Sequence, residues 1–125
     1  MKHLLILISI LLFSSPVIGQ ESGVLYLYET SSGKKWGTFG DGKVQPKYKG
    51  EIMNGKPNGF GFQTYKNGNK YFGEHKNGLP NGQGRSIYPD GSMYLGEYKD
   101  GKPWNVKGYD KEGDIIGKWV NGVKQ

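Results

Sequence analysis

Residues 71–93 read YFGEHKNGLPNGQGRSIYPDGSM, and their opening phrase, Tyr-x-Gly-Glu, begins at Tyr48, Tyr71 and Tyr94. The three phrases are 23 residues apart, and a further glycine follows each glutamate by four positions. A fixed period of about 20 to 50 residues is typical of an array in which one small unit stacks on the next. The sequence therefore predicts repeat units at 48–70, 71–93 and 94–115, and a partial unit at 116–125.

Each unit is predicted to be a β-hairpin. In the second unit, residues 71–76 are expected to form a strand, 77–82 a turn rich in Asn, Gly and Pro, and 83–88 the returning strand, before a second turn at 89–92. Glycine or proline interrupts almost every stretch of helical length. The predicted fold class is all-β, an elongated single-layer antiparallel meander of stacked hairpins.

Strand alternation places Tyr71, Gly73 and His75 on one face of the sheet, and Phe72 and Glu74 on the other. Glycine leaves room for the flat ring of a neighbouring strand. We therefore expect tyrosines packed over glycines along the whole array. The residues expected to build it are Tyr48, Gly50, Gly55, Gly59, Gly61, Gly73, Gly78, Gly82, Gly84, Gly96 and Gly101.

Both ends of the array depart from the pattern. Residues 20–47 are expected to form an N-terminal cap with strands at 24–28 and 36–39. In the third unit, Trp104 reads as an insertion and Val106 stands where the other units have glycine. Trp104 and Trp119 are expected to cover the open edge, with an aromatic contact platform as the alternative.

The first nineteen residues have the layout of a secretory signal peptide. Met1-Lys2-His3 gives a short positive start, and residues 4–13 are an apolar run about half as long as a membrane span needs. We expect cleavage after Gly19 and export to a periplasm or the outside, with an uncleaved anchor as the alternative. The absence of cysteine excludes disulfides, a lipoprotein anchor and thiol chemistry.

Charge and composition favour a binding or structural protein. The chain has a formal charge of +6 and 22 glycines, and its lysines are interleaved with acidic residues along the sequence. Solvated sheet edges explain such lysines, and weak attraction to anionic lipid or polymer is the alternative. Arg85 is the single arginine, which argues against base-specific binding of nucleic acid.

No catalytic set, cofactor motif or metal-ligand spacing is apparent. The one histidine beyond residue 19, His75, lies on the tyrosine-bearing face and is interpreted as a packing residue. Glu51, Glu74 and Glu97 recur once per unit, on the order of 10 Å apart if the hairpins stack. This recurrence indicates a structural role, such as pairing with a cross-strand lysine.

The phrase Tyr-x-Gly-Glu-x-x-x-Gly, followed by Pro-Asn-Gly-x-Gly and Tyr-x-x-Gly, resembles the MORN (membrane occupation and recognition nexus) repeat. The resemblance covers residues 48–101 closely and 102–122 loosely. It implies an elongated hairpin array used for protein or lipid contact. A weaker resemblance is to choline-binding repeats, whose paired aromatic residues box a quaternary ammonium group, but here the tryptophans fall outside the two regular units.

Three functions are weighed on this basis. The first is a non-enzymatic exported module that binds a protein or another cell-envelope component. The second is peripheral binding to anionic membrane lipid, and the third is a cell-envelope enzyme acting on glycans. The two open sheet edges leave self-association as a further alternative. The candidate binding residues, which are expected to be partly exposed, are Tyr65, Tyr71, Tyr88, Tyr94 and Tyr98.

Overall fold

The computed structural model describes residues 20–125, so the predicted signal peptide at 1–19 lies outside the described residues. Within residues 20–125 all regular structure is β, and no helix there is long and apolar enough to cross a membrane. The strands are β1 (Gln20–Thr30), β2 (Gly33–Gly37), β3 (Lys47–Met53), β4 (Lys56–Thr64), β5 (Lys70–Lys76), β6 (Leu79–Ile87), β7 (Met93–Lys99), β8 (Lys102–Tyr109), β9 (Ile115–Val120) and β10 (Val123–Lys124).

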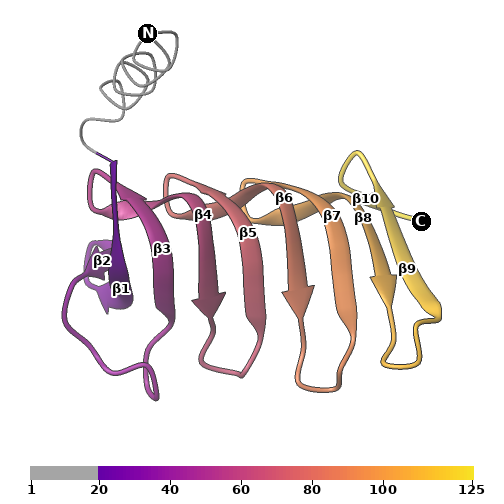
Figure 1. The fold of residues 1–125 in the computed structure, drawn as a ribbon, viewed down its shortest axis with the longest axis horizontal. Coiled ribbons are helices and arrows are strands. Elements are labelled where there is room, and N and C mark those ends of the chain that lie inside the picture. Colours follow the sequence, from indigo (N-terminus) through magenta and orange to yellow (C-terminus); the bar gives the residue numbers. More distant parts are fainter. Residues whose placement is uncertain (1–19) are drawn as a thin grey trace, which may run out of the picture.

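The ten strands form one open antiparallel sheet, as predicted. Figure 1 shows β3 to β9 side by side in chain order along the molecule. The order departs from a simple meander at one end, because β1 lies between β2 and β3 and pairs with both. The strand expected at 36–39 ends at Gly37, and Phe39 is exposed.

The hairpins close through tight two-residue turns. In the second unit the turn is Asn77-Gly78, where both residues have positive φ, 51° and 88°. This is the geometry that a two-residue hairpin of type I′ requires, and Asn-Gly is its preferred sequence. The prediction of a turn over 77–82 was therefore wrong, because β6 begins at Leu79.

The residues expected in that longer turn instead form a bulge. Gly73 pairs with Gly84, yet His75 pairs with Pro80, so β6 carries two more residues than β5 across this interval. The same shift recurs between β3 and β4. A bulge bends its strand and increases the local twist. In Figure 1 the tight-turn ends of the hairpins curve behind the strands.

The tyrosine-over-glycine packing is present. The Tyr71 ring lies against Gly84, and its hydroxyl donates a hydrogen bond of 2.9 Å to the carbonyl of Glu74. Tyr48 repeats both contacts one unit earlier, against Gly61 and the carbonyl of Glu51. Because the hydroxyl is bonded, the phenol can be buried without leaving a polar group unsatisfied.

The third unit keeps the contact of a tyrosine with a glycine, but its two strands pair in a different register. Tyr94 packs on Gly108, as Tyr71 packs on Gly84, so the alignment with an insertion at Trp104 agrees with the packing. The register differs, because Gly96 pairs with Val106 instead of a glycine. Val106 is 2% exposed and belongs to the same buried cluster as Tyr71 and Tyr98.

Candidate functional site

One face of the sheet, here called the inner face, carries the buried aromatic residues. Tyr48, Gln63, Tyr71, Ser86 and Tyr94 stand in a single cross-strand row over β3 to β7. Tyr48 and Tyr71 are 0% and 1% exposed. The predicted alternation of the two faces is therefore confirmed for these strands.

A continuous stack of rings runs beside this row. His75 lies between Tyr48 and Tyr71, with ring centroids 4.7 and 5.0 Å away, and Tyr71 meets Tyr98 at 5.1 Å. All three contacts are edge-to-face, the favourable arrangement for rings of this kind. The stacked rings form the base of the inner face. Their contacts confirm the interpretation of His75 as a packing residue.

Two further tyrosines approach the inner face from the longer turns. Tyr65 opens the turn 65–69, in which its N–H donates to the carbonyl of Asn69. Tyr88 opens the turn 88–92 with the equivalent bond to Ser92. In the third unit, Asp110 holds this turn position, so the row of turn tyrosines ends at Tyr88.

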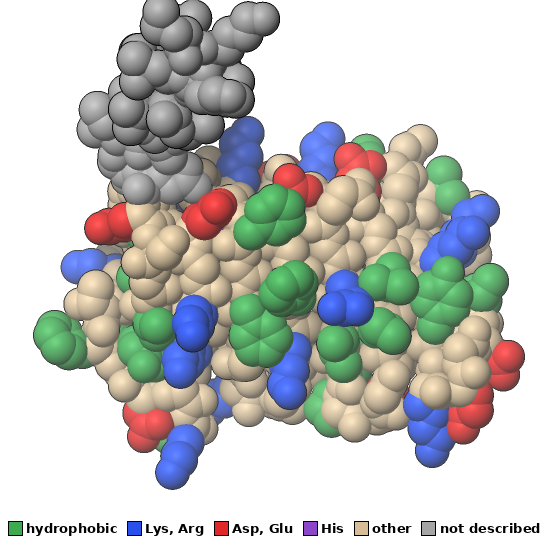
Figure 2. All heavy atoms as spheres, viewed as in Figure 1, with side chains coloured by type: hydrophobic (Ala, Val, Ile, Leu, Met, Phe, Trp, Pro, Cys, Tyr) green, Lys and Arg blue, Asp and Glu red, His purple; other side chains and the backbone are tan. Residues whose placement is uncertain are grey.

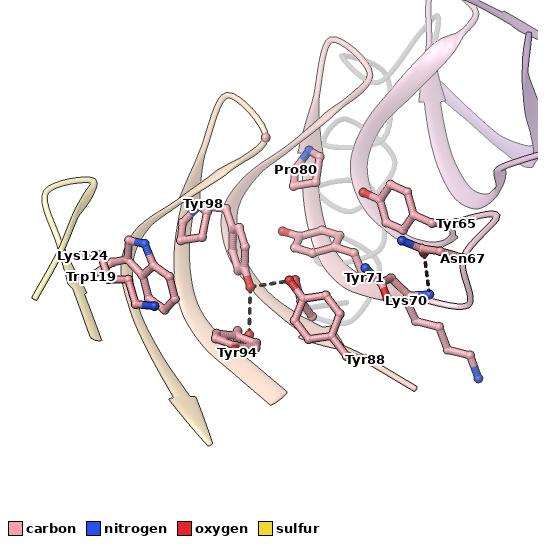
Figure 3. Close-up of a pocket in the computed structure, with 14 residues that line it drawn as sticks. Tyr65, Asn67, Lys70, Tyr71, Pro80, Tyr88, Tyr94, Tyr98, Trp119 and Lys124 are labelled. Carbon is pink, nitrogen blue, oxygen red and sulfur yellow. Dashed lines mark hydrogen bonds between the residues drawn. The ribbon is translucent and has the colours of Figure 1, made fainter. Parts of the chain in front are cut away.

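These elements enclose a cavity of about 380 Å³. Its wall includes all five candidate residues, Tyr65, Tyr71, Tyr88, Tyr94 and Tyr98, which come from two turns and two strands. Figure 3 shows their rings gathered around one space. Tyr71 and Tyr98 are buried floor residues, so the expectation that all five would be partly exposed was wrong for these two. The binding role of the five residues stays a prediction.

The wall also includes two prolines that the sequence analysis did not name, and Trp119, which it named as edge cover or as a contact platform. Pro80 and Pro103 contribute apolar surface from β6 and β8, and Trp119 closes the C-terminal end with its ring 5.5 Å from Tyr94. The Lys124 ammonium group lies 5.5 Å from the Trp119 ring centroid. The repeat pattern could have identified the two prolines, because each follows the two-residue turn of its unit by the same number of positions.

A second cavity of about 290 Å³ lies next to the first, on the side of the N-terminal cap. The two cavities share Tyr65 and Pro80 in their walls, and Trp36 stands in the wall of the second. Gln63 also lines it, and the Oε1 atom of Gln63 is buried with no hydrogen-bond partner in the described structure. We call the two neighbouring cavities together the inner groove.

Burial disfavours the charged form of four phenol groups of the groove, those of Tyr65, Tyr71, Tyr88 and Tyr98. Burial raises the pKa of Tyr65 to about 12, with smaller contributions from the nearby Tyr88 and Tyr98. Burial also raises the pKa of Tyr71 and of Tyr98. The Tyr98 hydroxyl is 2.8 Å from Ser86 Oγ and donates to the carbonyl of Tyr94. The groove therefore presents uncharged hydroxyl groups between aromatic walls.

A comparison with protein families assigns this architecture. Two segments match the MORN repeat, residues 48–70 and 71–93. This chain is a MORN-repeat protein. The matched segments coincide with the first two units read from the sequence, and MORN repeats generally bind proteins or membrane lipids. Among curated proteins, none matches the chain.

The recurring glutamates serve the bulge of each MORN unit. Glu51 Oε2 accepts a hydrogen bond of 2.8 Å from the N–H of Phe60, and Glu74 Oε2 accepts one of 2.5 Å from Gln83. Glu97 instead accepts from the side-chain amide of Asn105 at 2.9 Å. The structural role predicted for these residues is confirmed, and the partners that the structure shows are amides of the bulges.

The outer face of the MORN array is different in character. A single cross-strand row runs over it from β1 to β9, with four apolar and four basic members. Phe62 and Phe72 are neighbours in this row, with ring centroids 6.2 Å apart, and Phe72 is 51% exposed. Figure 2 shows apolar and basic side chains mingled across this face. The row, here called the outer row, consists of Val24, Lys49, Phe62, Phe72, Arg85, Leu95, Lys107 and Lys118.

Proposed function

We propose that this protein is a non-enzymatic binding module whose inner groove holds an extended segment of a partner protein. The observation that carries the proposal is the convergence of the candidate tyrosines on one cavity that lies next to a second. Concave, mostly apolar sites with a few hydroxyl groups are the usual form of a binding site. The length of the groove, from Trp36 to Trp119, suits a chain segment better than a compact small molecule.

The groove offers binding groups but no arrangement for catalysis. His75 is 4% exposed and lies between two tyrosine rings. The recurring glutamates lie on the outer face, where bulge amides hold Glu51 and Glu74. A binding role therefore accounts for the groove with the fewest further assumptions.

Photo-crosslinking tests the assignment of the groove. A benzoylphenylalanine introduced at Tyr88 reports on the groove, and the same group at Phe72 reports on the outer face. We expect a protein adduct from position 88 that a second substitution, Tyr65→Ala, reduces at least about tenfold, while position 72 gives none. Adducts from position 72 alone would refute the groove as the binding surface.

A second candidate is binding of the outer row to an anionic membrane surface. Exposed rings such as Phe72 can enter the headgroup region, and each nearby lysine or arginine contributes about 1 kcal/mol of attraction there. Flotation with phosphatidylserine vesicles tests this, using Arg85→Gln as the weakened variant and Tyr88→Ala as the control. Binding should fall sharply as salt rises, because charges are screened within about 10 Å at 0.1 M. Binding that ignores salt would contradict this candidate.

We also propose that the protein is exported after cleavage behind Gly19. The support is the positive start and apolar run of residues 1–19. N-terminal sequencing of the protein recovered from its native source should begin at Gln20. A recovered chain that begins at Met1 would indicate an uncleaved anchor instead.

A further inference from the structure

The equivalent tyrosines of the groove are spaced by the geometry of the sheet. Tyr65 and Tyr88 hold the same position in successive longer turns, one repeat of two strands apart. Neighbouring strands lie about 4.8 Å apart, so one repeat advances about 9.6 Å along the array. A ligand lying along the groove therefore meets the same aromatic surface about every 9.6 Å.

Among extended peptide conformations, one has nearly this period. A polyproline II helix has three residues per turn and a rise of about 3.1 Å, so it presents the same side about every 9.3 Å. A β-strand repeats about every 6.7 Å and an α-helix about every 5.4 Å. Only the polyproline II ligand places equivalent residues on Tyr65 and Tyr88 together.

The chemistry of the walls agrees with this spacing. Grooves lined by aromatic rings are the usual binding sites for proline-rich segments, whose backbone carbonyls remain free to accept hydrogen bonds. The hydroxyl groups of Tyr65 and Tyr88 are donors at the cavity wall, whereas the single O–H of Ser86 is used by its bond to the Tyr98 hydroxyl. The unpaired Oε1 of Gln63 can accept from the N–H of a non-proline residue, which favours a ligand with other residues between its prolines.

The positive charges in the groove wall indicate which residues should flank the bound segment of the ligand. The wall of the larger cavity includes Lys70 and Lys124 and no carboxylate. An acidic residue beside the proline-rich stretch would gain from these two cations, and a basic one would not. Complementary charge of this kind steers encounter and suppresses wrong partners.

We propose that the inner groove binds a proline-rich, acid-flanked segment of a partner in the polyproline II conformation, with prolines every third residue along the array. This rests on the proposed function, since it names the class of segment that the groove would hold. The proposal makes the spacing of the prolines, and not only their number, the determinant of affinity.

Fluorescence anisotropy with paired synthetic peptides tests the spacing. Both peptides have the same composition and acidic ends, but one carries prolines three residues apart and the other four residues apart. We expect the first to bind the full-length protein at least about tenfold more tightly. Tyr88→Ala should abolish the difference, while Phe72→Ala on the outer face should preserve it, and circular dichroism shows that each variant is folded.

The other outcomes separate the two proposals. Equal binding of both peptides, lost in Tyr88→Ala, would leave the groove as a peptide site and overturn the polyproline II assignment. Displacement of peptide by a chitin oligosaccharide, with neither peptide showing a preference, would overturn it in favour of a glycan. If neither peptide binds, the polyproline II assignment fails, and crosslinking from position 88 then decides whether the groove holds a protein at all.

Discussion

The ring of Tyr71 occupies the space that any side chain at Gly84 would need. A Cβ atom placed on Gly84 would overlap the phenol oxygen and the ring carbons of Tyr71. The same relationship joins Tyr48 to Gly61. In both repeats, a large tyrosine side chain therefore packs against a glycine, which has no side chain.

We expect Gly84→Ala to destabilise the fold by about 2 to 3 kcal/mol, since overpacking of a tight core costs roughly 1 to 3 kcal/mol and Tyr71 is fixed by its hydrogen bond. Gly117→Ala is the matched control, because a Cβ there lies 3.3 Å from the nearest side-chain atom, on Trp119. Urea unfolding of both variants measures the difference. Equal midpoints for the two variants would contradict the packing argument.

The stability of the fold should decline in mild acid because of His75. Burial lowers the pKa of His75 to about 4, against 6.5 for an exposed histidine, although the carbonyls of Gly73 and Gly59 oppose the shift. The unfolded chain therefore binds more protons between these values, so stability is full above pH 6.5 and falls as the pH drops toward 4. The shift corresponds to roughly 3 kcal/mol.

Thermal melts from pH 7 to pH 4 measure this effect in the protein and in His75→Phe, which keeps a ring between Tyr48 and Tyr71. The variant should lose less stability than the original over this interval. Parallel pH profiles for the two proteins would show that His75 does not carry the dependence.

Removing the Glu74 carboxylate, which accepts a hydrogen bond in the bulge of the second unit, should destabilise that unit. Glu74→Ala leaves the N–H of Gln83 without its carboxylate partner, at a cost of about 1 to 3 kcal/mol. Glu74→Gln keeps an oxygen acceptor and should recover most of the loss. Hydrogen exchange at the Gln83 amide reports the local effect, with Glu112→Ala in an exposed turn as the control. Unchanged exchange in Glu74→Ala would contradict this role.

The two-residue turn of the second unit should tolerate glycine and resist other residues at position 77. Asn77 has φ of 51°, a left-handed conformation that costs an ordinary residue about 1 to 2 kcal/mol. We expect Asn77→Ala to lower stability by about 1 kcal/mol and Asn77→Gly to change it little, as judged by urea unfolding. A loss for glycine as large as that for alanine would show that the Asn77 side chain, which both variants lack, matters more than its backbone conformation.

The local rules of the hairpin were predictable from the sequence. The spacing of Tyr71, Gly73 and Gly84 identified the repeat and its packing, because alternation and ring size act within a few residues of each other. The candidate tyrosines could be named one by one. Their convergence on one cavity could not, since it depends on the bend that the bulges introduce.

Several features of the fold were not predicted because the sequence at those positions is compatible with more than one local structure. Residues 79–82 carry turn-forming Pro, Asn and Gly, yet they belong to strand β6, whose bulge is held by the hydrogen bond from the Gln83 amide to Glu74. The place of β1 between β2 and β3 was also not predicted, because a loop that crosses over a strand leaves no periodic signal. Trp119 fell outside the regular repeats and so gave no register by which to place it in the groove.

The position of β1 gives the array two unequal ends under mechanical load. β1 is held by ladders on both sides, to β2 and to β3, so drawing it out requires many backbone bonds to shear at once. At the other end, β10 is joined to β9 by only two residue pairs and can peel away one bond at a time. A molecule pulled between its termini would thus unravel from the C-terminal side first, so the inner groove would lose Lys124 and Trp119 before its other wall residues.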